Sequence, residues 1–366
     1  MFLGNANCRK NDDLYKTLMY DFVKKHGVIL EATNNSFENE GVFNPAAIKE
    51  GNNVHLFYRA VRTGNFSTIG YCKLDGPLKV IERSETPILF PENSQEFQGL
   101  EDPRITKIDN TYYLSYSAYD GINVFGAYAT SNDLKTFERK GIITPKFSFE
   151  EYAKLIRQNL NKISDKHLLF YDLFERHHLS NIMKANVYVW DKNVVFFPKK
   201  FNGKFAFLHR LFPTIQIVFF ENPQDLTRDF WVDYVTHLSD HIVLRTSHHY
   251  ERSHIGAGCP PIETPDGWLL IYHAAEITAN GTLYHAAAAL LDLENPRKII
   301  GQLNKPLICP TEDWEKKGVV SNVVFPTGTA LFDDELYIYY GAADSRIAVA
   351  SVNIDTLIKN LKTAGV

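Results

Sequence analysis

The sequence is poor in the residues from which disulfide frameworks and zinc sites are built. Among its 366 residues are four cysteines, and none stands in a CxxC or CxxH spacing. Disulfide scaffolds and zinc knuckles both need closely spaced cysteines. The paired histidines also lack a carboxylate or cysteine at ligand spacing, so neither a metal nor an organic cofactor is expected. We therefore expect free thiols at Cys8, Cys72, Cys259 and Cys309.

The sequence also lacks a strong charge of either sign and any long apolar run. Its 39 basic and 43 acidic residues nearly cancel, so the charge balance gives no attraction to nucleic acid or to an anionic membrane. No run approaches the ~18–20 apolar residues of a membrane span, and residues 1–12 do not read as a signal peptide. We expect a cytoplasmic or periplasmic protein without nucleic-acid or membrane partners. A chain trimmed of an export signal would look the same, which leaves the compartment open.

The sequence does contain enough apolar material for a large core. Apolar residues make up 45% of it and charged residues 22%, which excludes a disordered or collagen-like chain. A single compact core stops growing near ~250–300 residues. The length therefore allows one large closed domain or two ordinary ones.

Five segments repeat one pattern, which is a strand, a tight polar turn and an aromatic-rich strand. Asn, Asp and Gly in the turns supply what hairpins require. The segments are 46–61, 104–120, 194–210, 260–275 and 324–344, and a third strand follows at 69–75, 124–133, 284–292 and 347–355. Such meanders bury their faces only when they pack radially. We predict an all-β, five-bladed β-propeller that forms a single domain over residues 1–366, with a pair of β-sandwiches as the alternative.

One stretch, residues 149–184, breaks the strand pattern. Tyr152, Leu155 and Ile156 stand there at helical spacing, which predicts a helical insertion between blades two and three. The insertion would shape a pocket, join a second copy in a homo-oligomer, or merely pack against the blades. Further short helices are expected at residues 14–24 and 355–362.

In a propeller, functional residues come from equivalent loops at the mouth of the channel. The sharpest candidate is Asp102, because Pro103 restricts the backbone there and holds the carboxylate at a strand entrance, with Arg104 just beyond. An ordinary turn aspartate paired with an arginine would look alike. Other polar residues at such positions are Asn44, Arg59, Lys192, Glu251, His273 and Glu276.

With these motifs the chain resembles glycoside hydrolase family 130, the β-mannoside phosphorylases and mannosidases on five-bladed propellers. The likeness runs from residue 43 to residue 351. It is carried by FNPA at 43–46, GLEDPRI at 99–105, residues 192–204, IGAGCPPI at 255–262, GWLLIYH at 267–273, AAALLDLENP at 287–296, NVVFP at 322–326 and YYGAAD at 339–344. The resemblance implies an enzyme that removes mannose from the non-reducing end of short β-1,2- or β-1,4-linked manno-oligosaccharides with inversion.

The resemblance also implies residue roles. Asp102 would be the general acid, protonating the leaving oxygen through the 3-hydroxyl of the bound mannosyl unit. Burial beside Glu101 is expected to raise the pKa of Asp102, so that it holds its proton near neutral pH. No second carboxylate is placed as a covalent nucleophile, so a single inversion is expected. Contacts to sugar or nucleophile are expected from Asn44, Arg59, Arg104, Lys192, His209, His273 and Tyr284.

The nucleophile decides between two reactions. Inorganic phosphate as co-substrate needs cations, which the resemblance assigns to Arg59, Lys192 and His273. Water needs a carboxylate base, for which Glu276 is the first choice and Glu251 the second. Because an anionic Glu276 repels phosphate, and His254 stands where phosphorylases often have lysine, we expect hydrolysis by a small margin. The alternatives are an inverting phosphorylase that releases α-mannose 1-phosphate and a non-catalytic carbohydrate-binding propeller.

Overall fold

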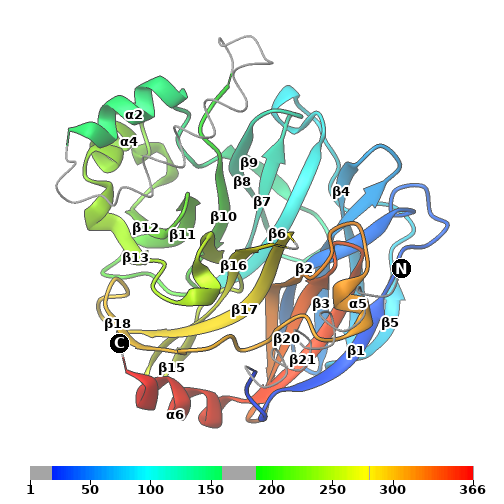
Figure 1. Ribbon diagram of the computed structural model, residues 1–366. Coiled ribbons are helices and arrows are strands. Elements are labelled where there is room, and N and C mark those ends of the chain that lie inside the picture. Colours follow the sequence, from blue (N-terminus) through cyan, green and yellow to red (C-terminus); the bar gives the residue numbers. More distant parts are fainter. Residues whose placement is uncertain (1–18, 159–186, 280, 366) are drawn as a thin grey trace.

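The computed structural model describes residues 19–158, 187–279 and 281–365, and its architecture is mostly β (Figure 1). The predicted fold class is confirmed at this level. Helices lie at the edges of the sheets and comprise α2 Phe149–Arg157, α4 Arg228–Thr236, α5 Asp313–Lys316 and α6 Ile354–Ala364. Short 3-10 turns are η1 Ser94–Glu96, η4 Pro223–Asp225, η5 Leu238–His241 and η6 His249–Glu251.

The described strands form five mainly antiparallel units in chain order. The first two are β2 Gly41–Glu50, β3 Asn53–Arg62, β4 Phe66–Asp75 and β5 Lys79–Arg83, then β6 Gly99–Ile108, β7 Thr111–Tyr119, β8 Val124–Ser131 and β9 Glu138–Ile142. A single parallel pair, Ser67 with Gly99, joins these two units. The third is β10 Asp191–Phe196, β11 Phe205–Leu211, β12 Ile215–Phe220 and β13 Ile242–Leu244. The fourth is β14 His254–Ala257, β15 Ile262–Thr264, β16 Gly267–Thr278, β17 Gly281–Leu291 and β18 Ile299–Gln302.

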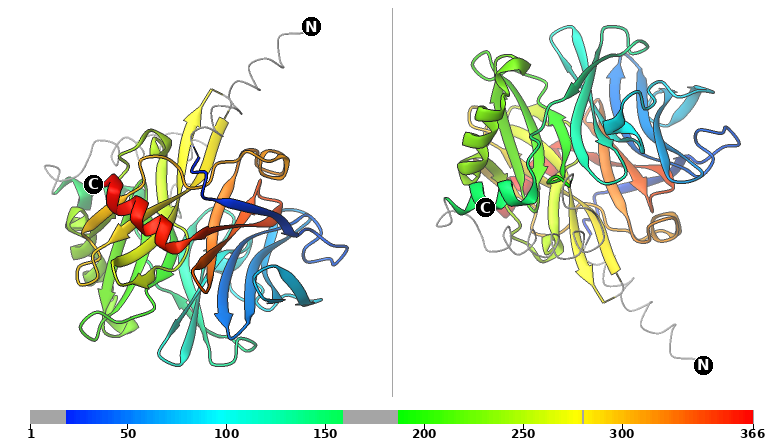
Figure 2. Two further views of the ribbon diagram at one scale, coloured as in Figure 1. Left: turned by 90° about the horizontal axis from the view of Figure 1, so that it is seen from below. Right: turned by 90° about the horizontal axis from the view of Figure 1, so that it is seen from above.

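The fifth unit is completed by a strand from the other end of the chain. It contains β19 Val324–Phe332, β20 Glu335–Ala342 and β21 Arg346–Asn353, and β1 Lys24–Leu30 pairs antiparallel with β21. Figure 2 shows β1 in dark blue beside these orange and red strands. The first and last described strands are therefore neighbours in one sheet.

All five predicted hairpins are present, and so are the four third strands. The hairpins are β2–β3, β6–β7, β10–β11, β15–β16 and β19–β20, and the third strands are β4, β8, β17 and β21. Positive φ angles occur in the turns as expected, for example 60° at Gly51 and 55° at Asp109. The turn residues thus set the hairpin positions that the sequence pattern predicts.

The apolar core is divided into five clusters, each between two of the units. Leu56 of the first unit packs in one cluster with Tyr339 of the fifth, while Phe57 packs with Leu114 of the second. The remaining clusters join the second unit to the third, the third to the fourth and the fourth to the fifth. Neighbouring residues of a strand face opposite sides of its sheet. Each of the five units therefore packs against two others, and the last unit packs against the first.

The predicted helices are confirmed in part. Helix α2 begins the predicted insertion, and Ser148 caps it by accepting a hydrogen bond from the Glu151 backbone N–H at 3.2 Å. The rest of that insertion lies outside the described residues. Helix α6 confirms the one predicted at 355–362. The helix predicted at 14–24 is wrong where the chain is described, because strand β1 begins at Lys24 and pairs with β21.

The cysteine prediction holds for the described residues. Cys72, Cys259 and Cys309 are free thiols buried in the core, and Cys8 lies outside the described residues. Within the described parts of the chain, no helix is long and apolar enough to cross a membrane.

A buried ion pair connects β1 to helix α5, and a hydrogen bond from β20 completes this contact. We expect it to contribute to the stability of the fifth unit. Lys25 Nζ lies 2.6 Å from Glu315 Oε2, and the two side chains are 9% and 0% exposed. The Tyr340 hydroxyl donates to the other oxygen of Glu315 at 2.8 Å. Removing one partner leaves an unpaired buried charge, so we predict that Glu315→Ala lowers the free energy of unfolding in urea by about 3–5 kcal/mol.

The matched control is Asp313→Ala, two residues earlier in the same helix. Asp313 forms an exposed pair with Lys317, and exposed pairs contribute little. Its urea midpoint should stay at the wild-type value. Equal midpoints for the two variants would contradict the prediction.

Candidate functional site

Several predicted site residues meet in one cavity of about 210 Å³. We call it the site cavity. Asn44, Arg59, Asp102, Lys192 and Tyr284 line it, as predicted, together with Glu101, Asn193, Arg210, Val320, Val323, Phe325 and Asp344. A larger cavity of about 490 Å³ lies between the β8–β9 side of the second unit and α4, and contains none of the predicted residues.

Three of the cavity residues share an unusual backbone conformation. Asn44, Asp102 and Asn193 have φ angles of 50°, 49° and 59°. Each lies where the pairing register of its strand shifts, in β2, β6 and β10 respectively. Such bulges re-aim side chains, and Asn and Asp tolerate this left-handed conformation better than other non-glycine residues. The same local device thus directs three polar side chains from three successive units into the site cavity.

The Asp102 carboxylate is held by hydrogen bonding and by charge. Asn44 Nδ2 donates to Asp102 Oδ1 at 2.7 Å. Arg59 Nη1 lies 3.8 Å from the same oxygen, while its Nη2 lies 2.7 Å from Glu101 Oε1. Arg59 Nε also donates to Ser67 Oγ at 2.9 Å, which fixes the guanidinium. Arg59 is therefore shared by two adjacent carboxylates.

Arg104 lies beneath this arrangement and supports the backbone. Its side chain is fully buried, and Nη1 donates to the Asp102 carbonyl at 2.8 Å. Its Nε donates to the Gly258 carbonyl, which links the second unit to the fourth. The Arg104 guanidinium thus holds the Asp102 turn in place from below and does not line the site cavity.

The electrostatics of Asp102 are the reverse of the expectation. Burial by itself would raise the pKa of Asp102, but Arg59, Arg104 and Lys192, with the hydrogen bond from Asn44, outweigh burial and lower the pKa. The predicted raised pKa is wrong, because the nearby cations favour the charged form of the carboxyl. The lowered pKa leaves Asp102 ionised near neutral pH.

A different carboxyl has a raised pKa. Burial is the main cause, and together with the charges of Asp102 and Glu101 it outweighs Arg59 and Lys192 and raises the pKa of Asp344 to about 6. Asp344 follows β20 and enters the cavity from the fifth unit. The site cavity therefore contains two carboxyl groups with opposite pKa shifts.

His273 stands one layer behind the cavity wall. Its ring is fully buried, stacks on Phe325 at 4.2 Å between centroids, and places Nε2 3.1 Å from Arg210 Nη1. Burial, followed by the charge of Arg210, lowers its pKa well below the ordinary value. A neutral His273 accepts from Arg210 and so orients that guanidinium. The cation in the cavity at this point is Arg210.

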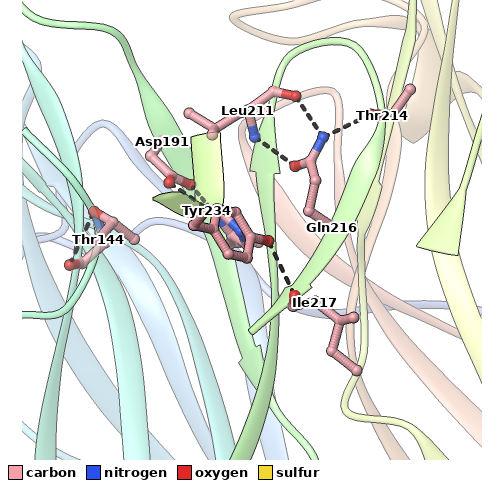
Figure 3. A network of polar contacts seen from close by, with 9 residues as sticks. Thr144, Asp191, Leu211, Thr214, Gln216, Ile217 and Tyr234 are labelled. Carbon is pink, nitrogen blue, oxygen red and sulfur yellow. Dashed lines mark hydrogen bonds and ion pairs between the residues drawn. The ribbon is translucent and has the colours of Figure 1, made fainter. Parts of the chain in front are cut away.

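Besides Arg104 and His273, three further predicted residues do not line the site cavity, namely His209, Glu251 and Glu276. His209 is fully buried and binds Asp191 at 2.8 Å and Tyr234 at 2.8 Å. Figure 3 shows Asp191 and Tyr234 in this network, beside Gln216, which closes the following turn through Leu211 and Thr214. His209 therefore cannot touch a sugar, and its role is structural.

Both candidate bases also lie elsewhere. Glu251 is buried, accepts backbone N–H groups of Ser247 and His248, and receives the Tyr272 hydroxyl at 2.6 Å. Glu276 lies 3.0 Å from His249 and is on the face of β16 opposite to His273, because the two residues are three positions apart in the strand. Neither carboxylate lines the site cavity, so the expected activation of water by Glu276 or Glu251 lacks the required placement.

The predicted site residues did not include Glu101, Asn193, Arg210 and Asp344, which also line the cavity. A signal existed for two of them. Arg210 is the neighbour of His209, and strand alternation makes only one of such a pair face a given cavity. Asp344 ends the YYGAAD stretch.

The geometry defines a class of protein. A cavity that joins three carboxyl groups, three cations and a tyrosine, on a rigid framework of sheets, is suited to bind a polar ligand and to transfer a proton to it. Such a lining is typical of an enzyme that acts on a polar substrate.

Comparison with known proteins identifies the family. The sequence profile of glycoside hydrolase family 130, described as β-1,4-mannooligosaccharide phosphorylase, matches residues 13–187 and 176–363. The chain belongs to this family. It is an enzyme that acts on β-mannosides, as a phosphorylase or a hydrolase.

Among its relatives are two proteins of Thermoanaerobacter sp. (strain X514). A 1,2-β-oligomannan phosphorylase is 33% identical over 88% of this chain and 93% of its own length. A β-1,2-mannobiose phosphorylase is 33% identical over 86% and 91%. Among solved structures, the β-1,2-mannobiose phosphorylase of Listeria innocua in complex with β-1,2-mannobiose has a TM-score of 0.67 at 23% identity, covering 93% of this chain and 99% of that one. At this identity the likeness shows a shared fold.

The raised pKa of Asp344 predicts a pH-dependent effect on stability. A carboxyl with a raised pKa in the folded state reduces stability progressively as pH rises from its ordinary range near ~4 through the folded value of about 6. Asp344→Asn removes this cost. At pH 7.5 the variant should therefore be more stable than the wild type, by on the order of 2 kcal/mol.

Urea denaturation at pH 7.5 and at pH 4 tests this sign. The advantage of Asp344→Asn should disappear at pH 4, where both side chains are neutral. Asp333→Asn, at an exposed turn with a similar φ angle of 53°, is the control and should show no pH-dependent gain. A variant that is less stable than the wild type at pH 7.5 would refute the assignment.

Proposed function

We propose that this protein is an inverting β-mannoside phosphorylase, which cleaves short β-mannosides with inorganic phosphate and releases α-mannose 1-phosphate. The observation that carries the proposal is the content of the site cavity. Arg59, Lys192 and Arg210 project into it beside Asp102, while neither candidate base for water does so. Phosphorolysis, the alternative in the sequence reasoning, is therefore preferred to hydrolysis. The two relatives at 33% identity carry phosphorylase names, which supports this choice.

We further propose that the five units are the blades of a single-domain, five-bladed propeller. Support comes from the closed series of apolar clusters and from the contacts of β2 with both β6 and β19. In such a fold the inner strands surround a central channel. The left-handed residues Asn44, Asp102 and Asn193 would then stand at equivalent places in the first three blades.

In the proposed reaction the non-reducing mannosyl unit occupies the site cavity. Asp102 gives its proton to the leaving oxygen through the mannosyl 3-hydroxyl, as the bond between C1 and that oxygen breaks. A phosphate oxygen supplies the electron pair that forms the new bond to C1 from the opposite face, so the configuration inverts once. Asn44 orients the Asp102 carboxyl, and Tyr284, Asn193 and Asp344 are available to bind sugar hydroxyls.

The lowered pKa of Asp102 fits this reaction only if bound phosphate raises it. Arg59 and Lys192 are two of the charges that lower this pKa. A phosphate dianion bound to the same cations offsets their field and adds negative charge nearby, and both effects raise the pKa of a carboxyl. Phosphate binding therefore prepares Asp102 to hold the proton that it later donates.

The linkage proposed is β-1,2. The two relatives that cover most of this chain are named for β-1,2-linked mannans. The family profile is described by a β-1,4 activity, so both linkages need testing.

The deciding assay incubates the protein with β-1,2- and β-1,4-mannobiose, with and without phosphate, and follows the products by proton NMR. We expect α-mannose 1-phosphate only when phosphate is present, with the β-1,2 substrate preferred. Asp102→Asn should retain mannobiose binding and lose on the order of 10²–10⁴-fold in kcat. Free mannose formed at an equal rate without phosphate would refute phosphorolysis, and an inert wild type that binds the sugar would identify a lectin.

A second prediction compares Arg210, a cation proposed to bind phosphate, with Glu276, the base expected for hydrolysis. Arg210→Ala should raise KM for phosphate by roughly 10- to 100-fold, the range expected for a charged hydrogen bond. Glu276→Gln is the counterpart, because Glu276 lies outside the site cavity, and it should leave kcat within about twofold of the wild type. Loss of turnover in Glu276→Gln would restore the hydrolytic interpretation.

A further inference from the structure

Among the described residues, the ammonium of Lys192 has no partner that takes up its hydrogen-bond donors. Its Nζ lies 3.8 Å from Glu101 Oε2, beyond hydrogen-bonding distance. Glu101 is already bound to Arg59 at 2.7 Å. Lys192 Nζ donates no hydrogen bond to any described residue, although the Lys192 side chain is only 21% exposed. The ammonium therefore keeps its hydrogen-bond donors for a ligand.

The flexible Lys192 side chain must be held in one orientation if it is to bind a ligand in the site cavity. The lysine stem has four rotatable bonds, and fixing it costs conformational entropy. The neighbouring group is Trp190, two residues earlier and so on the same side of the extended chain. Lys192 Nζ lies 5.3 Å from the centroid of the Trp190 ring. Tryptophan gives the strongest cation–π contact of the aromatic side chains, and it attracts the ammonium without using its N–H donors.

The Trp190 ring is itself fixed by the loop between β7 and β8. Its Nε1–H donates to the Ile122 carbonyl at 2.9 Å. That loop is held by Asp120, whose carboxylate accepts the backbone N–H groups of Ile122 and Asn123 at 2.8 and 2.7 Å. Asn123 in turn accepts the backbone N–H of Tyr188 at 2.8 Å. The chain before β10 is thus anchored to the second unit at two points, and the indole orientation is set by this contact.

We propose that Trp190 is a positioning residue for phosphate binding, holding the ammonium of Lys192 at the edge of the site cavity by a cation–π contact. This inference rests on the proposed function, since it assumes that the anion bound by Lys192 is phosphate. A carboxylate in the place of Trp190 would hold the lysine equally well but would cancel its charge. The indole holds it and leaves the charge available to an oxyanion.

The test compares Trp190→Leu and Trp190→Phe with the wild type in phosphorolysis of mannobiose. Trp190→Leu removes the aromatic face and should raise KM for phosphate by about 3- to 30-fold, the range of a partly buried cation–π contact. KM for mannobiose should stay unchanged. Trp190→Phe keeps an aromatic face without the N–H anchor, and its KM for phosphate should fall between the two.

A double-mutant cycle shows whether Trp190 acts through Lys192. In a Lys192→Met background, Trp190→Leu should have no further effect on KM for phosphate, because the charge that the ring holds is gone. Phe332→Leu is the matched control, since it removes another cation–π contact, with Lys49 at 4.9 Å, at the far end of β2 from Asn44. It should change neither KM value.

Calorimetric titration with sulfate, a dianion that does not titrate near neutral pH, gives a readout independent of turnover. Trp190→Leu should weaken sulfate binding by the same factor as it raises KM for phosphate. Additive effects in the cycle, or a rise in KM for mannobiose with KM for phosphate unchanged, would overturn the inference. A wild type that needs no phosphate would instead refute the proposed function, so the two failures are distinguishable.

Discussion

The site depends on one backbone constraint that occurs in three successive units. Asn44, Asp102 and Asn193 each adopt a left-handed conformation at a bulge near the start of an inner strand. In a regular strand, alternation would fix which face each side chain takes. The bulge breaks that alternation locally and turns the polar group into the site cavity. Only Asn, Asp and Gly accept the conformation readily, so the backbone requirement and the chemical requirement select the same residue types.

The charges around these residues form a second level of organisation. Arg59 is divided between Glu101 and Asp102, Arg210 is oriented by a neutral His273, and Lys192 rests against an aromatic ring. These three cations and the carboxyl groups of Glu101, Asp102 and Asp344 line one cavity. The proposed binding of phosphate there would change the pKa values of the carboxyl groups.

The sequence predicted the framework well because hairpins are local. Polar turns and alternating strands identified all five hairpins and the four third strands, and Asp102, singled out because Pro103 follows it, lines the site cavity. What could not be predicted was which side of a strand each residue faces. His209 was predicted to contact the substrate, but its neighbour Arg210 is the residue that lines the cavity. Glu276 was predicted to act beside His273, but strand alternation places the two side chains on opposite faces of β16.

Electrostatic balance was equally inaccessible to sequence. Proximity of Glu101 in the chain suggested a raised pKa for Asp102, but Arg59 and Lys192 arrive from other units and reverse the sign. The carboxyl that does have a raised pKa, Asp344, lies more than two hundred residues away in the sequence. The direction of a pKa shift in the cavity depends on all charges that the fold brings together, so it cannot be read from neighbours in the sequence.

The pairing of β1 with β21 has a consequence for how the site cavity is completed. Asp344 lies in the turn that leads into β21, and that strand remains an open edge until β1 docks on it. The first three units supply Asp102, Arg59 and Lys192, whereas Asp344 comes from the fifth unit. The site cavity is therefore complete only after the fifth unit, in which β1 pairs with β21, has folded.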